Sequence, residues 1–474
     1  MSFFVENIIS QLQNNQDVMT RQITCKGGVV ELIFLKSMSD KNEISEQIIS
    51  PIMRQNGEFT FEELKGKIIS SSEIEEIDVL DIVKNILQNK IVVIYANKAL
   101  AIDLEFFPAR LPSEPPTSPN IYGPREGFVE SIKTNMSLIR KRLPTQNLTI
   151  LQFEVGEETK SKVCMFYIKN IANKKVVKEI ADKIKKIKLN GVIDSYYIAE
   201  FLKKKPYSMF EQCGFQEKPD IVVAKMLEGR VAILVDGSPI AITLPYMVFE
   251  DFQSSNDYYT NYAYVNLIRI IRTIGVIIAT VIPGLYLSIR LYSYKVLPLN
   301  YVITIANSTK NLPFTPVLEI IFILLLFQIL YEVSLRLPQY LGLATSIVGA
   351  LVLGDTGVKA GLISPPGVII VAVSIMAIYT VPSQSAILTV LRAIFVILGA
   401  TVGIFGIVGG VIYFVNYINT LNYYETPYLA PYAPKIKTDL KDGLFKKPLS
   451  AMKGSIRSIP QTKQSQRREK QNGQ

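Results

Sequence analysis

The chain has 474 residues, of which 49% are hydrophobic and 19% charged, and its mean hydropathy is +0.25. This composition is too apolar for a protein that is soluble throughout, so part of the chain is expected to lie in lipid. The sequence contains no histidine, which excludes Ser-His-Asp and Cys-His catalysis and the HExxH zinc site. No GxxxxGK[ST] or GxGxxG motif follows a predicted strand. We therefore expect neither an enzyme nor a cofactor or metal site.

The formal net charge of +10 is unevenly distributed. Residues 1–268 contain 32 basic and 34 acidic side chains, whereas 269–418 contain 8 and 3, and 419–474 contain 11 and 4. The surplus flanks or follows the hydrophobic region, which is typical of a membrane protein with basic cytoplasmic flanks and not of a nucleic-acid-binding protein. The N-terminal sequence MSFFVENIISQLQNN lacks the pattern of a secretory signal, so the first region is expected in the cytosol.

Two segments of the first half match two later segments. VELIFLKSMSDKNEISEQIISPI (30–52) and VCMFYIKNIANKKVVKEIADKI (163–184) each read as an apolar strand, a polar turn and a helix. VKNILQNKIVVIYANKALAIDL (83–104) and VAKMLEGRVAILVDGSPIAITL (223–244) each read as a helix end and two strands around a tight turn. The pattern predicts two related α+β subdomains, although unrelated α+β segments can also resemble each other at this level.

The predicted subdomains occupy residues 1–107 and 144–250, separated by a stiff proline-rich connector at 108–122 and the basic stretch 123–143. An apolar stripe in that stretch predicts a helix with Pro124 in its first turn. The helix either docks on the second subdomain or binds a partner or anionic lipid and couples the subdomains to the membrane part. The stripe consists of Phe128, Ile132, Met136, Ile139 and Leu143, and the candidate coupling residues are Arg125, Glu126, Arg140, Lys141 and Arg142.

Residues 268–418 are predicted to form an α-helical polytopic membrane domain, followed by a basic cytosolic tail at 419–474. Cytoplasmic chain ends require an even number of spans, so 342–361, the least apolar segment, is predicted to be a re-entrant or broken helix. Six spans remain open if 296–307 also enters the bilayer. The four full spans are expected at about 270–291, 316–337, 365–382 and 391–418.

Polar residues within these segments are candidates for an ion path, because placing them in lipid is costly. Glu332 and Asp355 each have a basic residue four positions later, Arg336 and Lys359, with which they can neutralise themselves. Glu319 has no partner at this spacing; it would favour cations if it faced a polar cavity, and an interfacial position also fits. The pore candidates are Glu319, Gln328, Glu332, Asp355 and Lys359, and the candidate helix-packing glycines are Gly399, Gly403 and Gly410.

Five motifs follow one another along most of the chain: GPREGFVESIKTNMSLIRKRL, KPDIVVAKMLEGRVAILVDGSPIAITLP, EDFQSSNDYY, RLPQYLGLATSIVGALVLGDTGVKAGLISPP and ETPYLAPYAP. In this order they resemble the A subunits of bacterial spore germinant receptors. The resemblance implies a multi-pass protein of the spore inner membrane that acts with a transporter-like B subunit and a lipoprotein C subunit in nutrient sensing. It also implies a homo-oligomeric, ligand-gated ion channel. Many relatives carry Gln and Glu at the positions of Asp355 and Lys359, which weakens selectivity arguments from those two residues.

Two alternatives to a channel remain. A secondary transporter would require an inverted repeat among the spans, and the sequence shows none. A non-conducting scaffold of the receptor would leave ion flux unchanged when charges within the spans are neutralised.

Overall fold

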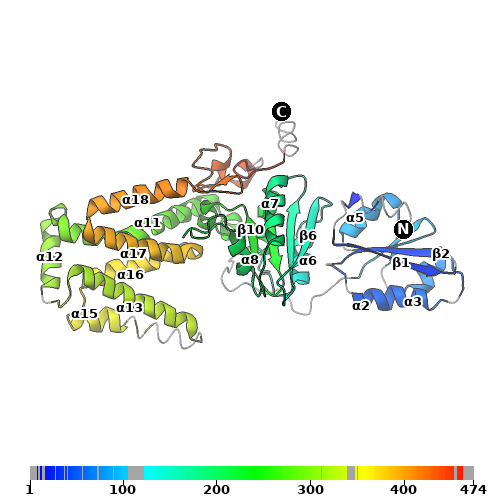
Figure 1. Cartoon of the computed structure of the whole chain (residues 1–474), viewed down its shortest axis with the longest axis horizontal. Helices are drawn as coiled ribbons and strands as arrows, with labels where there is room; N and C mark the ends of the chain where they lie inside the picture. Colours follow the sequence, from blue (N-terminus) through cyan, green and yellow to red (C-terminus); the bar gives the residue numbers. More distant parts are fainter. Residues whose placement is uncertain are drawn as a thin grey trace. The chain divides into compact units, whose positions relative to one another are not determined.

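The computed structural model of the chain divides into two compact units, each built from more than one segment of the sequence (Figure 1). Unit 1 comprises Met1–Met247, Asn422–Thr426 and Lys453–Gln474, and unit 2 comprises Val248–Leu421 and Pro427–Met452. The proline-rich connector predicted at 108–122 lies almost wholly outside the described residues. These are residues 8, 11–12, 16–104 and 122–462, with gaps at 27, 37, 40, 56, 72–73, 89, 311, 339–346, 348, 350 and 453–455.

The first subdomain of unit 1 contains an antiparallel five-stranded sheet of order β1-β2-β4-β5-β3. Its register runs from Val18 opposite Leu35 in the β1–β2 pair to Tyr95 opposite Lys98 in the β4–β5 pair. Ala96 and Asn97 join β4 to β5 with positive φ, as a tight hairpin requires. The elements are β1 Val18–Cys25, β2 Gly28–Leu35, α2 Lys41–Ile44, α3 Ser50–Met53, α4 Phe61–Glu63, β3 Ile74–Ile77, α5 Ile82–Leu87, β4 Ile91–Tyr95 and β5 Lys98–Ile102.

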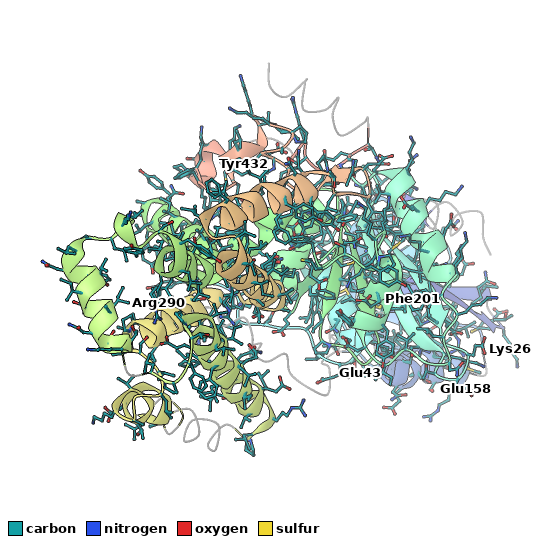
Figure 2. The ribbon with its side chains drawn as sticks, turned by 60° about the vertical axis from the view of Figure 1, so that its left-hand side comes forward. Lys26, Glu43, Glu158, Phe201, Arg290 and Tyr432 are labelled. Atoms are coloured by element: carbon teal, nitrogen blue, oxygen red, sulfur yellow. The ribbon has the colours of Figure 1, made fainter. Side chains whose placement is uncertain are left out.

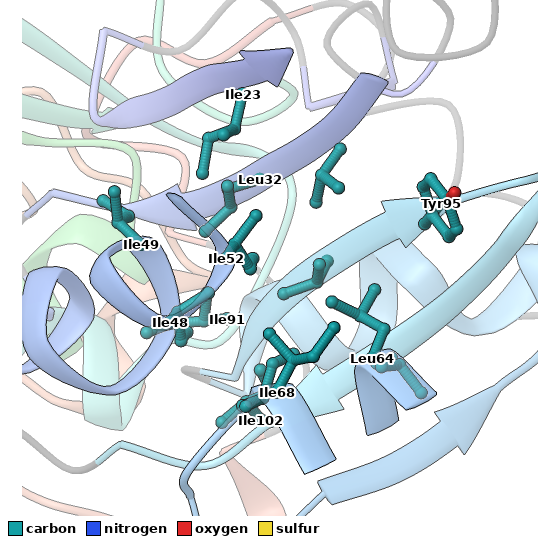
Figure 3. Close-up of a cluster of buried hydrophobic side chains, with 14 of the residues drawn as sticks. Ile23, Leu32, Ile48, Ile49, Ile52, Leu64, Ile68, Ile91, Tyr95 and Ile102 are labelled. Atoms are coloured by element: carbon teal, nitrogen blue, oxygen red, sulfur yellow. The ribbon is translucent and has the colours of Figure 1, made fainter. Parts of the chain in front are cut away.

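The core of this subdomain forms where the helices of residues 41–68 pack on one face of the sheet (Figure 3). Ile48 and Leu64 from the helical segments and Ile91 from β4 are fully buried. The Tyr95 hydroxyl donates a hydrogen bond of 3.0 Å to the Phe59 carbonyl, so its one polar atom is satisfied within the cluster. Burial of this apolar surface supplies the main stabilisation of the subdomain.

The second subdomain repeats this arrangement, because its sheet has the order β6-β7-β9-β10-β8, the same order strand for strand. The prediction of two related α+β subdomains is confirmed. Among the helices of this subdomain, α6 packs against α9 and α7 packs against α8. The elements are α6 Ile132–Arg142, β6 Leu148–Val155, β7 Ser161–Ile168, α7 Lys174–Lys185, α8 Ser195–Leu202, β8 Gly214–Gln216, α9 Pro219–Leu227, β9 Val231–Val235 and β10 Ala241–Leu244.

The helix predicted to start near Pro124 begins eight residues later, at Ile132. The preceding segment is held in a non-helical conformation by the side chain of Asn135, which accepts from the Val129 amide at 2.8 Å and donates to the Val129 carbonyl at 2.5 Å. Phe128 also donates its amide to the Glu217 carbonyl. The predicted apolar stripe is buried in the core of the second subdomain. Of the two arrangements expected for this helix, the structure therefore has the one in which it docks on the second subdomain.

Unit 2 is helical, and three of its described helices are long and apolar enough to cross a bilayer: α11, α13 and the segment Pro382–Thr401. Pro365–Ile378 and Ile404–Asn419 are shorter apolar helices. A small hairpin follows, formed by β11 Asn422–Tyr423 and β12 Thr426–Pro427. The helices are α10 Asn256–Tyr259, α11 Tyr262–Tyr292, α12 Leu299–Thr309, α13 Pro316–Arg336, α15 Gly357–Lys359, α16 Pro365–Ile378, α17 Ser385–Thr401 and α18 Ile404–Asn419.

The continuous span expected at 391–418 is instead two helices, α17 and α18, that fold back on each other. Gly403 joins them with a φ of +69°, a conformation that glycine adopts without steric cost. A Cβ on Gly410 would lie 2.8 Å from a Leu398 methyl carbon, which shows how closely the two helices pack. α12 has 11 residues, or about 16 Å, which is too short to cross the hydrocarbon layer. Most of the segment 342–350 lies outside the described residues.

Candidate functional site in the helical unit

A buried ion pair joins three helices of unit 2. Glu319, in the first turn of α13, is fully buried, and its carboxylate accepts from Arg290 of α11 at 2.8 Å. The other carboxylate oxygen accepts from the amide of Ser364 at 2.8 Å and from its hydroxyl. Ser364 also caps α16 by accepting from the Gly367 amide. Glu319 therefore holds the start of α13, the end of α11 and the start of α16 together.

This junction fixes the direction of the helices. Ser364 lies beside Glu319, whereas Arg336 ends α13 seventeen residues later, about 26 Å away along the helix. The start of α16 therefore lies beside the start of α13 and far along the helix from its end. Tyr292 donates to the Ala400 carbonyl at 2.8 Å, which places the end of α17 beside the end of α11.

The other pore candidates lie on the surface of the unit. Glu332 and Arg336 form an ion pair of 2.6 Å with both side chains exposed, and Asp355 and Lys359 form one of 2.8 Å. Gln328 is also exposed, one helical turn before Glu332 on α13. The structure thus separates Glu319, which is enclosed within one chain, from the remaining four, which face outward.

A further charged residue, Arg392 of α17, is absent from the predicted set. It is 4% exposed, and its NH1 atom has no hydrogen-bond partner among the described residues. Residues 262–421 contain three carboxylates, Glu319, Glu332 and Asp355, and each is paired with another basic residue. The signal in the sequence is a lone arginine within an apolar helix, a pattern that marks functional candidates.

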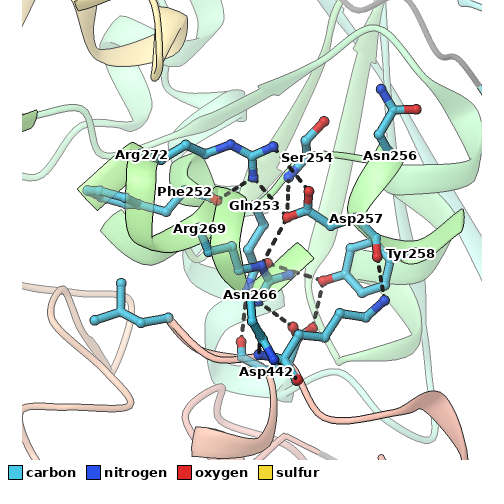
Figure 4. A network of polar contacts seen from close by, with 12 residues as sticks. Phe252, Gln253, Ser254, Asn256, Asp257, Tyr258, Asn266, Arg269, Arg272 and Asp442 are labelled. Atoms are coloured by element: carbon cyan, nitrogen blue, oxygen red, sulfur yellow. Dashed lines mark hydrogen bonds and ion pairs between the residues drawn. The ribbon is translucent and has the colours of Figure 1, made fainter. Parts of the chain in front are cut away.

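Asp257 of α10 is the centre of a polar network at the start of α11 (Figure 4). Its buried carboxylate accepts from Arg269 Nε at 2.9 Å and from both terminal nitrogens of Arg272, at 2.9 and 3.1 Å. Arg272 also donates to the Phe252 carbonyl. Charge-assisted bonds of this kind are strong and directional, so they fix the entry into the first long helix.

The same network holds the segment that follows the last helix. Arg269, which is fully buried, donates to the Asp442 carboxylate at 2.8 Å, and Tyr258 donates to the other oxygen at 2.6 Å. The Lys446 ammonium donates to the Asp257 carbonyl, and burial lowers the pKa of this lysine. The beginning and the end of unit 2 are therefore tied to each other.

The predicted glycines occupy two kinds of position. The α11 and α17 backbones touch at Gly284 and Gly399, where a Cβ on either residue would overlap the other helix. Gly410 faces the side chains of Leu398 and Phe395. Gly403 lies in the turn between α17 and α18.

The residues proposed for coupling have different environments. Arg125 and Lys141 are exposed, and Arg142 forms an ion pair with Glu126. Arg140 is buried and donates to the buried carboxylate of Asp17, which precedes β1, at 3.1 Å. This pair ties the first subdomain to α6. Within the described residues, no group of three or more Cys, Asp or Glu side chains is arranged to hold a metal ion.

These features define a protein with a duplicated α+β region and a helical unit of candidate membrane spans with ion pairs between its helices. The model of the family described as Bacillus/Clostridium GerA spore germination protein matches residues 6–457. The chain belongs to this GerA family of spore germination proteins.

The chain is also similar to individual proteins. The uncharacterized membrane protein YfkQ of Bacillus subtilis (strain 168) is 32% identical over 453 residues, covering 94% of this chain and 88% of the relative. Spore germination protein KA of the same strain is 31% identical, covering 88% and 78%. Spore germination protein GerLA of Bacillus cereus is 29% identical, covering 98% and 97%. The crystal structure of the N-terminal domain of the A subunit of the Bacillus megaterium germinant receptor GerK3 is also similar, with a TM-score of 0.37 and 23% identity, covering 51% of this chain and 92% of that chain.

Proposed function

We propose that this chain is the A subunit of a nutrient-responsive germinant receptor and that several copies surround an ion path in the spore inner membrane. Membership in the GerA family supports the role in germination. In this proposal the chain acts with a transporter-like B subunit and a lipoprotein C subunit. In this proposal both chain ends lie in the cytoplasm, which the basic segment 419–474 favours for the C-terminal end.

The observation that carries the channel proposal is the outward face of α13. Gln328, Glu332 and Arg336 are exposed on a helix that is otherwise apolar enough to span a bilayer. Polar side chains at such positions are costly against lipid, so contact with water or with other copies is favoured. A ring of copies would place a Gln328 and a Glu332 from each chain around a central path, an arrangement that selects cations.

The buried pair of Glu319 and Arg290 has a different role in this proposal. It is enclosed within one chain, so it holds the helices in place and does not contact permeating ions. Nutrient binding in the B subunit would shift the packing of α13 and α16, whose starts are joined by the contact of Glu319 with Ser364. The junction is then the element with two arrangements that gating requires.

The test is nutrient-triggered potassium release from spores in which this chain and its B and C partners form the only receptor. We expect Glu332→Gln to change the rate or ion preference of release at matched protein levels. Glu62→Gln, which removes an exposed carboxylate from α4 in unit 1, is the control. If Glu332→Gln and Gln328→Leu both release potassium like the native chain, the α13 face does not line the path. The scaffold function would then be favoured.

A further inference from the structure

The second subdomain exposes apolar side chains on and just before α8 that its own core does not use. Tyr197 and Phe201 lie four residues apart on α8 and are 44% and 45% exposed, and Ile193, which precedes the helix by two residues, is 70% exposed (Phe201 is labelled in Figure 2). The opposite side of α8, with Ile198 and Leu202, is fully buried. After the helix, Tyr207 and Met209 are exposed as well. Both the buried face and the exposed face of α8 therefore carry apolar side chains.

Lysines are concentrated in the two helices that include this stripe, α7 and α8. Residues 174–205, which form α7 and α8, contain ten lysines and four acidic residues, whereas the rest of residues 1–268 contains 22 basic and 30 acidic side chains. The two helices are neighbours, since the Lys183 ammonium of α7 donates to the Leu202 carbonyl of α8 at 3.0 Å. The basic charge is thus local to this pair of helices. Its exposed lysines include Lys178, Lys186, Lys188, Lys204 and Lys205.

The covalent chain ties this surface to an apolar helix. The buried hydroxyl of Tyr424 donates to the Leu202 carbonyl, and the Lys204 ammonium lies 4.7 Å from the centre of the Tyr424 ring. Tyr424 follows Asn419, the last residue of α18, by five residues, which span at most about 18 Å. The end of α8 is therefore held by a short tether to the end of a helix that is apolar enough to lie in lipid.

We propose that the α7–α8 surface, defined by this apolar stripe and these lysines, binds the headgroup layer of an anionic phospholipid membrane. Aromatic and aliphatic side chains enter the boundary between headgroups and acyl chains, and lysines beside them pair with lipid phosphates. Lysine stems extend along such a surface with the ammonium in the polar layer. The short tether favours lipid over a soluble acidic partner, because it keeps the surface close to the end of α18.

The absence of tryptophan from the chain provides a direct test. Phe201→Trp introduces a single fluorophore into the stripe, and Leu80→Trp introduces one at a 94% exposed position of the first subdomain as a control. Each full-length variant is reconstituted in protein-free liposomes of phosphatidylcholine with or without phosphatidylglycerol, with brominated acyl chains as quenchers. We expect quenching of Phe201→Trp in phosphatidylglycerol, weaker quenching in pure phosphatidylcholine or at high salt, and none of Leu80→Trp.

Lysine substitutions test the charge contribution. Lys186→Gln and Lys205→Gln, added singly to Phe201→Trp, are each expected to shift the docking equilibrium about fivefold toward the unquenched state. Equal quenching in both lipids would overturn the role of anionic headgroups. A blue-shifted emission without bromine quenching would overturn lipid binding and assign the surface to a protein partner. The readout is lipid contact alone, so it is independent of ion conduction.

Discussion

The backbone of α11 at Gly284 touches the backbone of α17 at Gly399, and neither position has room for a Cβ. Small residues at such crossings allow helices in lipid to approach closely, and helix packing there depends on this contact. We expect Gly399→Ala to lower the free energy of unfolding by about 2 kcal/mol, the usual cost of overpacking. Thermal unfolding of the purified chain measures this effect. Gly409→Ala in α18 is the control, because no atom of the other described elements lies within 4 Å of its Cβ position. Equal stability of the two variants would contradict the expectation.

Removing Glu319 should be far more damaging than removing Glu332. Glu319→Ala leaves Arg290 largely buried without its carboxylate, and breaking a buried pair costs about 3 to 5 kcal/mol. Glu332→Ala breaks an exposed pair and should cost less than about 1 kcal/mol. The combined change Arg290→Met with Glu319→Leu should recover most of the lost stability. A double variant as unstable as Glu319→Ala would contradict the expectation that the cost comes from the unpaired charge of Arg290.

Substitution of Arg392 is expected to stabilise the chain, in contrast to substitution of Glu319. Arg392 is buried, and its NH1 atom has no hydrogen-bond partner among the described residues, so its charge carries a desolvation cost. Arg392→Met should therefore raise the free energy of unfolding of the isolated chain by about 2 kcal/mol. Thermal unfolding in detergent is again the measurement. A loss of stability on substitution would reveal an interaction of Arg392 in the native protein that compensates its charge.

The network around Asp257 predicts a protease-sensitive variant. Asp442→Ala removes the carboxylate that receives both Arg269 and Tyr258, so the segment around it should open more often. Limited trypsin digestion should then cut at Lys441 or Lys447 faster than in the native chain. Glu58→Gln, at an exposed position of unit 1, should leave the digestion rate unchanged.

The three cysteines should differ in reactivity. Burial raises the pKa of the Cys164 and Cys213 thiols to about 12, so at pH 8 only about one molecule in ten thousand carries either thiolate. Cys25 is partly exposed, and burial raises its pKa as well. A thiol reagent should therefore label one cysteine in the native chain and all three after denaturation. Rapid native labelling of Cys213 would contradict its position beneath α8.

The sequence contains enough information to predict the duplicated sheets, because alternating apolar residues and the turns at Ala96-Asn97 and Asp236-Gly237 are local signals. The start of α6 depends on the side chain of Asn135 folding back on Val129, which helix periodicity does not report. The division of 391–418 into α17 and α18 was hidden because the hydropathy is continuous across Gly403.

The pairing of Glu319 could not be predicted for a related reason. Its partner Arg290 lies 29 residues away on another helix, beyond the spacing of three or four at which pairs within one helix can be recognised. Arg392 is visible as a lone charge in an apolar segment, but only the three-dimensional arrangement shows that the carboxylates of residues 262–421 are paired with other basic residues.

The tie between Arg269 and Asp442 also sets the order of events during synthesis. The two residues are separated by 173 positions, so at about 5 to 20 residues per second the ribosome adds Asp442 roughly 10 to 35 s after Arg269. Until then, the guanidinium at the base of the first long helix has Asp257 alone as its carboxylate partner in this network. A nascent or truncated chain that ends before residue 442 would therefore keep α11 incompletely anchored, and the helical unit reaches its final state only when translation is nearly complete.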